Sequence, residues 1–381
     1  MSATLAPLAA TIPTQLLIGG QWCDSADGST IEVLDPAYGE AIAAVASGTP
    51  ADARHAVAAA EQAASSWAAT APRERGEVLR RAYELMTARA DEIAELIVRE
   101  NGKALPDARG EVAYAAEFFR WYAEEAVRIH GSLLTAPSGG NRILVLRQPI
   151  GVAVLVTPWN FPAAMATRKI APALAAGCTV VLKPASETPL TALMIGALLT
   201  EAGVPPGVVN VLPAHRSSTV VRELLAQRAV RKLSFTGSTE VGRLLLGQAS
   251  ERVLSCSMEL GGNAPFLVLA DADIDAAVAG AMVAKMRNGG EACTAANRFY
   301  VHASVAEQFS QRLATAMAAM TVGPGLEPGV QVGPLVNRAA VEKVEELVGD
   351  AVDLGARVRT GGGSPSGHGF FYTPTVLDQV P

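Results

Sequence analysis

The sequence predicts an α/β protein whose core is a parallel, doubly wound β-sheet with helices on both faces. Between positions 151 and 259, short runs of mostly apolar residues alternate with segments of helical periodicity. Strands that alternate with helices in this way pair in parallel and bury both faces of the sheet. The predicted strands are GVAVLVT (151–157), TVVLK (179–183), VVNVL (208–212), KLSFT (232–236) and RVLSCSME (252–259).

The residues before this sheet predict strand hairpins in the first 50 positions and then three helices. The turn sequences GGQW and DPAYGE interrupt short apolar runs near the start of the chain. Thr49 and Pro50 supply an N-cap and a first-turn proline for a helix over about 51–69. Apolar spacing predicts a second helix over about 73–100 and a third over about 107–130, and we assign no chemistry to these two helices.

A second α/β unit is predicted after the sheet. Its last residues, FFYTPTVLDQVP, contain no predicted helix or strand, so we expect the chain to stop inside this unit. Before the sheet, residues 131–149 change to polar turns around the strand-like run RILVLRQP. The elements expected in the second unit are strands near 265–269 and 298–302 and helices near 273–288, 304–320 and 337–354.

Composition indicates a compact protein of two or three domains. Half of the 381 residues are hydrophobic, the formal net charge is −6, and no basic cluster occurs, which argues against nucleic acid and anionic membranes as partners. The start, MSATLAPLAATIPT, lacks the basic segment of a secretory leader, and no apolar run is long enough to span a bilayer. The four cysteines form no CxxC pair and the five histidines no ligand pattern, so we expect a cytoplasmic protein without a metal site.

The turns after the predicted strands carry polar, glycine-rich motifs. In a doubly wound sheet, ligands bind beyond the carboxyl ends of the strands. No G-x-G-x-x-G motif occurs in this region, so the strand pattern alone does not specify a nucleotide site. The motifs are TPWNFP (157–162), KPASETP (183–189), TGSTEVG (236–242), ELGGNAP (259–265) and, in the second unit, NGGEACTAANR (288–298).

In this order, the five motifs resemble the aldehyde dehydrogenase family along essentially the whole chain. RQPIGV, PWNFPAAMATRK, LAAGCTVVLKPAS, VRKLSFTGSTEVGR and ELGGNAPF are most similar to the succinate-semialdehyde dehydrogenase branch. The resemblance implies NAD(P)-dependent oxidation of an aldehyde through a cysteine thiohemiacetal and a thioester. It also implies a Rossmann-like NAD(P)-binding domain (1–130 and 150–259), an oligomerisation strand segment (131–149), a catalytic domain (260–381) and a homo-oligomer.

The resemblance assigns three catalytic residues. Cys293 matches the nucleophile, whose thiolate converts the carbonyl carbon into a tetrahedral hydride donor. Asn160 matches the residue that stabilises the resulting alkoxide together with the backbone N–H of Cys293. Glu259 matches the general base for thioester hydrolysis, and its place at the end of an apolar strand predicts a position away from the surface. Cys178 and Cys256, in apolar strands, fit structural cysteines instead.

The resemblance also assigns residues that contact the cofactor. Lys183 would bond the adenosine ribose, and the helix that opens at Gly237 and Ser238 would favour the pyrophosphate. Family members selective for NAD often carry a glutamate three residues after this lysine, where this chain has Ser186, so NADP is favoured over NAD, although Glu187 lies next to it. The other expected contacts are Thr157, Pro158, Trp159 and Leu260.

Arg168 and Arg287 match arginines that bind the distal carboxylate of the substrate in the succinate-semialdehyde branch. The planar guanidinium group suits a carboxylate. Without the resemblance, solvated arginines in the clusters RK (168–169) and KMR (285–287) would be the better interpretation. Succinate semialdehyde is therefore the expected substrate, and another semialdehyde or an uncharged aldehyde is the alternative.

Three departures from the family pattern matter. Glu291 stands where many relatives have glutamine, and an ionised carboxylate there would disfavour the thiolate of Cys293. No cysteine closely follows Cys293, so we expect no disulfide switch at this position. The family pattern continues past Pro381 with a segment similar to EEIFGP and a strand that pairs with a neighbouring subunit. A truncated nucleotide-binding relative with little catalysis is therefore the rival interpretation, and the expected homo-oligomer depends on that strand.

Overall fold

The computed structural model describes residues 12–381, so residues 1–11 of the expected cofactor domain lie outside the described residues. Two antiparallel hairpins open the described chain, as predicted. Their turns lie at Gly19–Gly20 and between Asp35 and Glu40. Their strands are β1 (Leu16–Ile18), β2 (Gln21–Cys23), β3 (Thr30–Asp35) and β4 (Glu40–Ala46).

A helical layer follows the hairpins. Thr49 caps its first helix, because its hydroxyl accepts the Asp52 N–H while the Asp52 carboxylate accepts the Thr49 N–H at 2.8 Å. The prediction of one helix over 73–100 is wrong, since the backbone leaves the helical conformation at Arg89 (φ −107°, ψ 24°) and two helices result. The elements are α1 (Pro50–Ala69), α2 (Pro72–Ala88), α3 (Ala90–Asn101), α4 (Leu105–Glu125) and the short 3₁₀ segment η1 (Ala126–Arg128).

The predicted strand runs form the central sheet. They become β7 (Val152–Val156), β8 (Thr179–Lys183), β9 (Val209–Val211), β10 (Val230–Gly237) and β11 (Ser255–Leu260). These strands are parallel in the order β11–β10–β7–β8–β9, and β1 and β2 extend the sheet antiparallel beyond β9. The chain moves outward from β7 to β9 and then returns to β10 on the other side of β7. The doubly wound sheet is therefore confirmed, and its switch point lies between β7 and β10.

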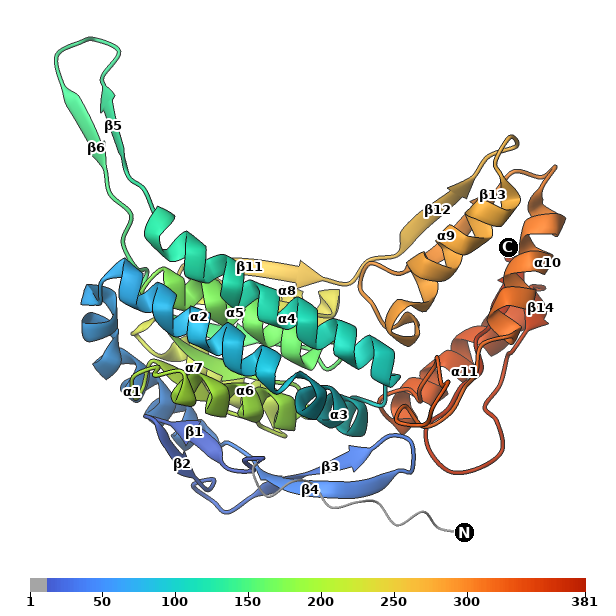
Figure 1. The fold of residues 1–381 in the computed structure, drawn as a ribbon, viewed down its shortest axis with the longest axis horizontal. Helices are drawn as coiled ribbons and strands as arrows, with labels where there is room; N and C mark the ends of the chain where they lie inside the picture. The colour runs from blue at the N-terminus through green and yellow to red at the C-terminus, as the bar shows by residue number, and fades with distance from the viewer. Residues whose placement is uncertain (1–11) are drawn as a thin grey trace.

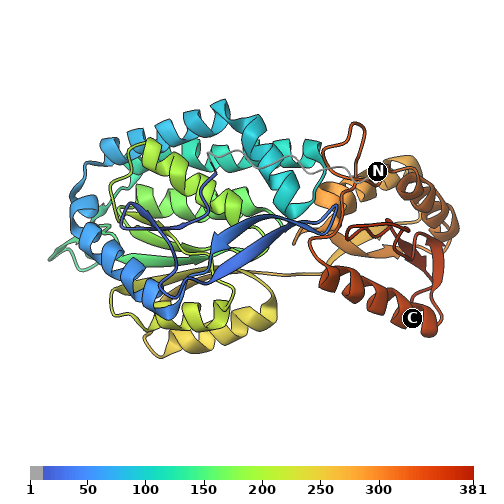
Figure 2. The same ribbon diagram turned by 90° about the horizontal axis from the view of Figure 1, so that it is seen from below.

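Helices cover both faces of this sheet (Figure 2). The helices between the strands are α5 (Pro162–Ala175), α6 (Pro189–Glu201), α7 (Ser217–Ala226) and α8 (Thr239–Ser250). Every residue of β7 is buried, and neighbouring side chains face opposite cores. Leu155 packs in the core with α2 to α6, whereas Val154 packs in the core with α1, α7 and α8. Burial on both faces explains why these strands are continuous apolar runs.

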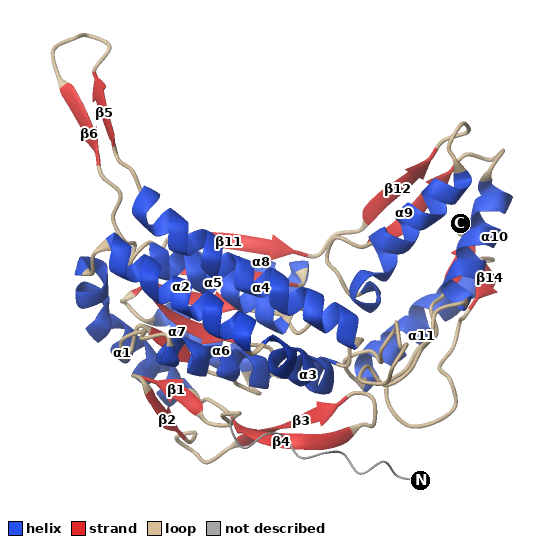
Figure 3. Ribbon diagram, viewed as in Figure 1, coloured by secondary structure: helices blue, strands red, loops and turns tan. Residues whose placement is uncertain are grey.

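A hairpin of β5 (Ser132–Thr135) and β6 (Arg142–Val145) projects away from the sheet and its helices (Figure 3). The run RILVLRQP predicted β6, whereas β5 was missed. All residues of both strands are exposed, and Leu133 and Leu144 pair across the hairpin. This arm therefore presents leucine side chains that nothing in the described chain covers.

The second unit lies beside the first (Figure 1). Its elements are β12 (Ala264–Val268), α9 (Ile274–Met286), the 3₁₀ segment η2 (Arg287–Gly290), β13 (Ala296–Val301), α10 (Ala306–Ala318), α11 (Arg338–Asp353), β14 (Arg357–Thr360) and β15 (Val376–Asp378). The expectation of no strand in the last residues is wrong, because β15 pairs with β14. Ion pairs of Arg357 and Arg359 with Asp378 stabilise that pairing. No described helix is long and apolar enough to cross a membrane.

The two units touch through close backbone contacts. Leu105 at the start of α4 donates its N–H to the carbonyl of Gly325 at 2.9 Å. A Cβ added at Gly333 would lie 1.9 Å from the Gly102 carbonyl oxygen, so only glycine fits there. These contacts bring the loop between α3 and α4 against the second unit.

Candidate active site

The turn after β7 lies at the switch point and is held from two sides. The Thr157 N–H donates to the Lys183 carbonyl at 3.2 Å, which joins the ends of β7 and β8. The Trp159 carbonyl accepts a hydrogen bond from the side chain of Asn101 at 3.1 Å. These two hydrogen bonds therefore hold the turn that carries the next residue, Asn160.

The structure brings Asn160 to the segment that carries Cys293. The Asn160 side-chain amide donates to the Glu291 carbonyl at 2.6 Å. Cys293 itself is exposed in the turn between η2 and β13, as the polar sequence around it predicted. Gly262 also approaches this turn, since a Cβ built there would lie 4.0 Å from the Cys293 carbonyl oxygen. Three of the predicted motifs, 157–162, 259–265 and 288–298, therefore converge.

Glu259 lies on β11, the edge strand of the sheet, and its side chain is exposed. The expectation that it lies away from the surface is wrong, because alternate residues of this strand are exposed and half-buried, and Glu259 is one of the exposed residues. Its charge acts on Lys169 of α5, whose ammonium donates to the Ser234 hydroxyl at 3.0 Å. Burial lowers the pKa of Lys169 to about 8, and the Glu259 carboxylate opposes this shift.

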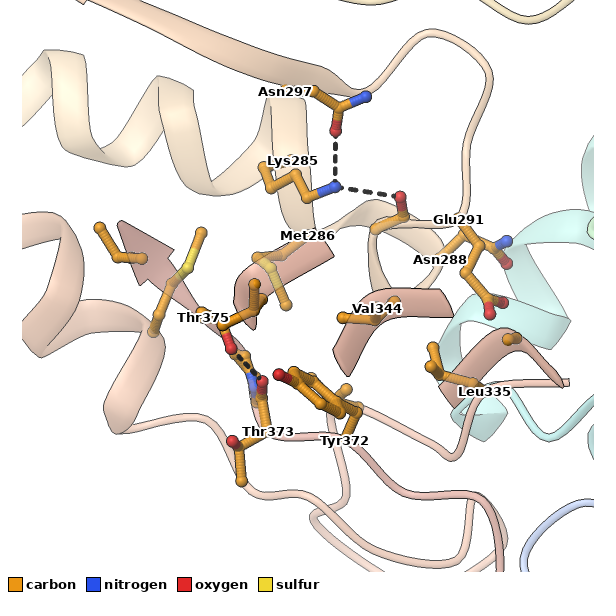
Figure 4. Close-up of a pocket in the computed structure, with 18 of the residues that line it drawn as sticks. Lys285, Met286, Asn288, Glu291, Asn297, Leu335, Val344, Tyr372, Thr373 and Thr375 are labelled. Atoms are coloured by element: carbon orange, nitrogen blue, oxygen red, sulfur yellow. Dashed lines mark hydrogen bonds between the residues drawn. The ribbon is translucent and has the colours of Figure 1, made fainter. Parts of the chain in front are cut away.

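Glu291 does not carry its full charge at neutral pH. Burial raises its pKa to about 8, and the nearby ammonium groups of Lys103 and Lys285 only partly oppose the shift. Lys285 is held by Asn297 Oδ1 at 2.8 Å and by the Gly290 carbonyl (Figure 4). Because the protonated form dominates below pH 8, Glu291 exerts little repulsion on a thiolate at neutral pH.

The residues assigned to the cofactor follow the strand ends from β8 to β11. Lys183 is buried, and burial lowers its pKa to about 8 against the opposing charge of Glu187. Ser186 donates its hydroxyl proton to the Glu187 carboxylate at 3.1 Å, so a carboxylate does lie beside this serine. Ser238 caps α8 by accepting the Val241 N–H at 3.2 Å and is exposed. The N-terminus of α8 therefore faces solvent, where its free N–H groups suit a phosphate.

The remaining assigned residues line the same edge of the sheet. Thr157 is buried, and Pro158 and Trp159 are half-buried in the turn after β7. Leu260 ends β11 against α8, where a Cβ added at Gly242 would lie 2.5 Å from Leu260 Cδ2. Gly237 ends the paired strand β10, opposite Leu260. Two features at this edge fit a dinucleotide: the buried ammonium of Lys183 and the solvent-facing N-terminus of α8.

The two arginines assigned to the substrate lie over different aromatic rings. The Arg168 guanidinium carbon is 5.6 Å from the centre of the Phe118 ring, and that of Arg287 is 5.5 Å from the centre of the Phe161 ring. Arg287 lines a pocket of about 150 Å³ together with Tyr114 and Phe161, and Arg168 is not among its lining residues. The structure therefore places Arg287 at a pocket. That Arg168 and Arg287 bind the same carboxylate stays a prediction.

A larger pocket of about 650 Å³ is lined by residues 288–291 of the loop that carries Cys293, here called the nucleophile loop (Figure 4). Its wall includes Trp159, Lys285 and Glu291 from the site and Val344 and Tyr372 from the second unit. Sequence reasoning missed this pocket, because its lining comes from segments far apart in the chain. The described residues contain no cluster of histidine, cysteine and carboxylate side chains that could hold a metal ion.

Sequence reasoning also missed Lys103, Glu111 and Asn288. Their side chains are buried and join the turn after β7 to the nucleophile loop. The sequence marked this region only through Gly102, which ends the preceding helix. No spacing rule relates Lys103 to its partners Glu111 and Asn288, which lie 8 and 185 residues further along the chain.

A doubly wound sheet with polar strand-end turns and an exposed cysteine at its switch point is typical of α/β proteins that bind a ligand at this edge, and comparison with known proteins gives the family. Residues 22–381 match the aldehyde dehydrogenase family, and the chain belongs to it. It is 56% identical to the succinate-semialdehyde dehydrogenase of Paenarthrobacter nicotinovorans, over 89% of this chain and 76% of that protein. It is 48% identical to the glutarate-semialdehyde dehydrogenase of Pseudomonas putida, over 96% of this chain and 76% of that protein. The crystal structure of an Escherichia coli NADP-dependent enzyme superposes with a TM-score of 0.95 at 47% identity, covering 97% of this chain and 77% of that one.

Proposed function

We propose that this chain oxidises a semialdehyde to the acid with NAD(P), using Cys293 as nucleophile, Asn160 as alkoxide donor and Glu259 as general base. The observation that carries the proposal is the 2.6 Å hydrogen bond between the Asn160 amide and the Glu291 carbonyl, beside Cys293. This contact supports the proposal, because it joins the proposed alkoxide donor to the loop that carries Cys293, at the switch point of the sheet, where ligands bind.

The chemistry requires each of the three side chains at a different moment. The Cys293 thiolate adds to the carbonyl carbon, and the new alkoxide accepts hydrogen bonds from the second Asn160 N–H and the Cys293 backbone N–H. When bound, NAD(P) would supply the acceptor for the hydride that leaves this carbon, and loss of the hydride leaves a thioester on Cys293. Glu259 then takes a proton from water, the resulting hydroxide attacks the thioester, and the acid departs as the Cys293 thiolate is restored.

The residues at the end of β8 support NADP as the cofactor. Lys183 offers a cation and Ser186 a small hydroxyl where a 2′-phosphate would lie, and the Escherichia coli structural relative is described as NADP-dependent. Glu187 beside Ser186 is the feature that would favour NAD. Ser186→Glu should shift the ratio of kcat/KM values towards NAD, because a carboxylate repels the 2′-phosphate.

The substrate we propose is succinate semialdehyde, bound through Arg287 and Arg168. The similarity to relatives named for succinate and glutarate semialdehydes supports an aldehyde with a distal carboxylate. Arg287 at the smaller pocket supplies a cation for that carboxylate. A second semialdehyde of different length is the alternative substrate.

The proposed organisation assigns residues 1–130 and 150–259 to cofactor binding, 260–381 to catalysis and residues 131–149 to contacts between subunits. The exposed leucines of β5 and β6 support a homo-oligomer joined through this hairpin.

The test is an assay of NADP reduction by succinate semialdehyde with wild type, Cys293→Ala and Glu259→Gln. Cys293→Ala should abolish turnover while cofactor binding and folding persist. Glu259→Gln should give a single burst of reduced cofactor without steady turnover, because hydride transfer precedes deacylation. Wild-type turnover in Cys293→Ala would refute the nucleophile, and a wild type that binds cofactor without turnover would favour the rival nucleotide-binding interpretation.

A further inference from the structure

Lys103 is buried in the loop between α3 and α4, and its ammonium group reaches the candidate site. Each of its three N–H donors has an oxygen partner: Glu111 Oε2 at 2.6 Å, the Asn160 carbonyl at 2.7 Å and Asn288 Oδ1 at 2.6 Å. The ammonium also lies 4.5 Å from the centre of the Phe161 ring. Because all its donors are used inside the protein, Lys103 holds structure and does not bind a ligand.

Two of these partners belong to the segments that carry the proposed catalytic groups. Asn160 is in the turn after β7, and Asn288 is in η2, in the same loop as Cys293. The Asn288 side chain also donates to the Asn160 carbonyl at 3.0 Å, while the Asn160 side chain donates to the Glu291 carbonyl. Lys103 is therefore the cation at which these two segments meet.

Glu111, the third partner, anchors this cluster to the sheet domain. Its second carboxylate oxygen accepts the N–H groups of Ala163 and Ala164 at 2.8 and 3.2 Å, at the start of α5. The same carboxylate thus caps α5 and neutralises Lys103. A buried charged group whose hydrogen bonds are all satisfied fixes the geometry around it, since any displacement leaves a charge unpaired.

We propose that Lys103 is a positioning residue for aldehyde oxidation, whose ammonium group sets the placement of the Asn160 amide relative to Cys293. This inference rests on the proposed function and deepens it. One N–H of the Asn160 amide is bonded to Glu291, which leaves the other for the alkoxide. A shift of either segment would therefore weaken alkoxide stabilisation in the transition state.

Asn288→Gly tests the proposal without disturbing the backbone. Asn288 has a φ of 57°, which glycine adopts without strain, so the substitution removes the buried side chain and its two hydrogen bonds without straining the backbone. We expect kcat to fall about 10- to 100-fold, part of the effect of losing one alkoxide donor. The Kd for NADP should stay within about twofold of wild type, since the side chain of Asn288 bonds to Lys103 and Asn160 and to none of the residues assigned to the cofactor.

Val253→Gly is the matched control. Val253 is also a non-glycine residue at positive φ (53°), but it is 89% exposed and lies outside the site. Its replacement should leave kcat unchanged. A similar loss of kcat in this control would overturn the proposal, because glycine at a positive φ would then explain the effect.

The double substitution Lys103→Met with Glu111→Gln tests the ammonium group itself. It removes both buried charges together, and the new side-chain amide oxygen can still accept from the N–H groups of α5. We expect a folded protein, judged by circular dichroism, with the same selective loss of kcat. Adding Asn288→Gly to this variant should cause little further loss, because the substitutions act through one network.

The proposal is overturned if kcat in Asn288→Gly and in the double variant stays within about threefold of wild type. It is also overturned if the Kd for NADP rises in parallel with the loss of kcat, since that would indicate a general structural defect. Retained turnover in Cys293→Ala would refute the proposed nucleophile instead, and the kcat of Asn288→Gly would still report on Lys103.

Discussion

Lys183 illustrates how burial prepares a side chain for a ligand. Its ammonium lies at the end of β8, and the cost of burying its charge lowers its pKa to about 8. Within residues 12–381, the carboxylate of Glu187 is the nearby charge that stabilises the cation. A bound phosphate would add a second counter-charge and favour the protonated form.

The affinity for NADP should therefore fall as the pH rises above about 8. Below this pH the Lys183 ammonium is already charged. Above it, Lys183 must take up a proton when NADP binds, and this requirement raises Kd by up to about tenfold per pH unit. The measurement is Kd for NADP between pH 6.5 and 9.5, with NAD as the comparison. Lys183→Met should bind more weakly and show a flatter profile, and an equally steep rise in that variant would contradict the role of Lys183.

Arg168 and Arg287 should select aldehydes that carry a distal carboxylate. Removing either one should cost about tenfold or more in kcat/KM for succinate semialdehyde, since a charge-assisted hydrogen bond contributes about 1.5–3 kcal/mol. The loss should appear mainly in KM, because the carboxylate is bound equally in the ground and transition states. Butanal, which has no carboxylate, should be little affected in Arg168→Ala and Arg287→Ala. A parallel fall for both aldehydes would show that the arginines support the fold.

At the residue scale, the sequence predicted the motifs of the candidate site but not the buried side chains that hold these motifs in place. The polar turns predicted where Asn160 and Cys293 lie, because strand ends of a parallel sheet meet at one edge. The exposure of Glu259 followed instead from its place on an edge strand, which is a property of strand order. Lys103 escaped prediction for a similar reason, since its partners come together only in the folded chain.

At the scale of elements, the central strands β7 and β8 were predicted well because burial on both faces makes them continuous apolar runs. The break between α2 and α3 was missed because Arg89 is an ordinary helix former and no glycine or proline marks the boundary. β15 was missed because it is only three residues long and depends on Arg357 and Arg359 pairing with Asp378. A short strand that is stabilised by residues far away in the chain has little pattern in its own sequence by which it could be predicted.

The β5–β6 hairpin should mediate association between copies of the chain. Leu133 and Leu144 are 66% and 65% exposed on an arm that projects from the protein (Figure 1), an arrangement that disfavours an isolated monomer. Leu133→Lys with Leu144→Lys should therefore shift the molecular mass in solution towards the monomer, as measured by light scattering. Ser138→Lys, at the exposed tip of the same hairpin, is the control for added charge. An unchanged mass in the leucine variant would show that the arm does not join subunits.

For the whole molecule, the buried ionisable groups predict an unusual dependence of stability on pH. Burial raises the pKa of Glu100 and of Glu291 from 4.5 to about 8, and it lowers the pKa of Lys169 and of Lys183 from 10.5 to about 8. The carboxyl groups and the ammonium groups therefore change protonation in the folded protein near one pH. Their unfolded-state pKa values lie on opposite sides of it.

The sign of each contribution follows from which state binds more protons. Between pH 4.5 and 8 the folded protein keeps the protons of Glu100 and Glu291 while the unfolded chain has lost them, so the free energy of unfolding falls as pH rises. Between pH 8 and 10.5 the unfolded chain keeps the protons of Lys169 and Lys183 while the folded protein has lost them, so the free energy of unfolding rises with pH. Each group contributes a slope of at most about 1.4 kcal/mol per pH unit.

These four groups together should produce a minimum in stability near pH 8. The measurement is the free energy of unfolding from urea titrations between pH 5.5 and 10, at constant ionic strength. Glu291→Gln should reduce the fall on the acid side of the minimum and leave the rise on the alkaline side unchanged, because an amide has no proton to lose in this range. Lys169→Met should do the reverse, since it removes one of the groups that titrate above pH 8. A smooth maximum near pH 8 in the wild type would contradict the prediction, because it would require the buried carboxyl groups to be ionised in the folded protein well below that pH.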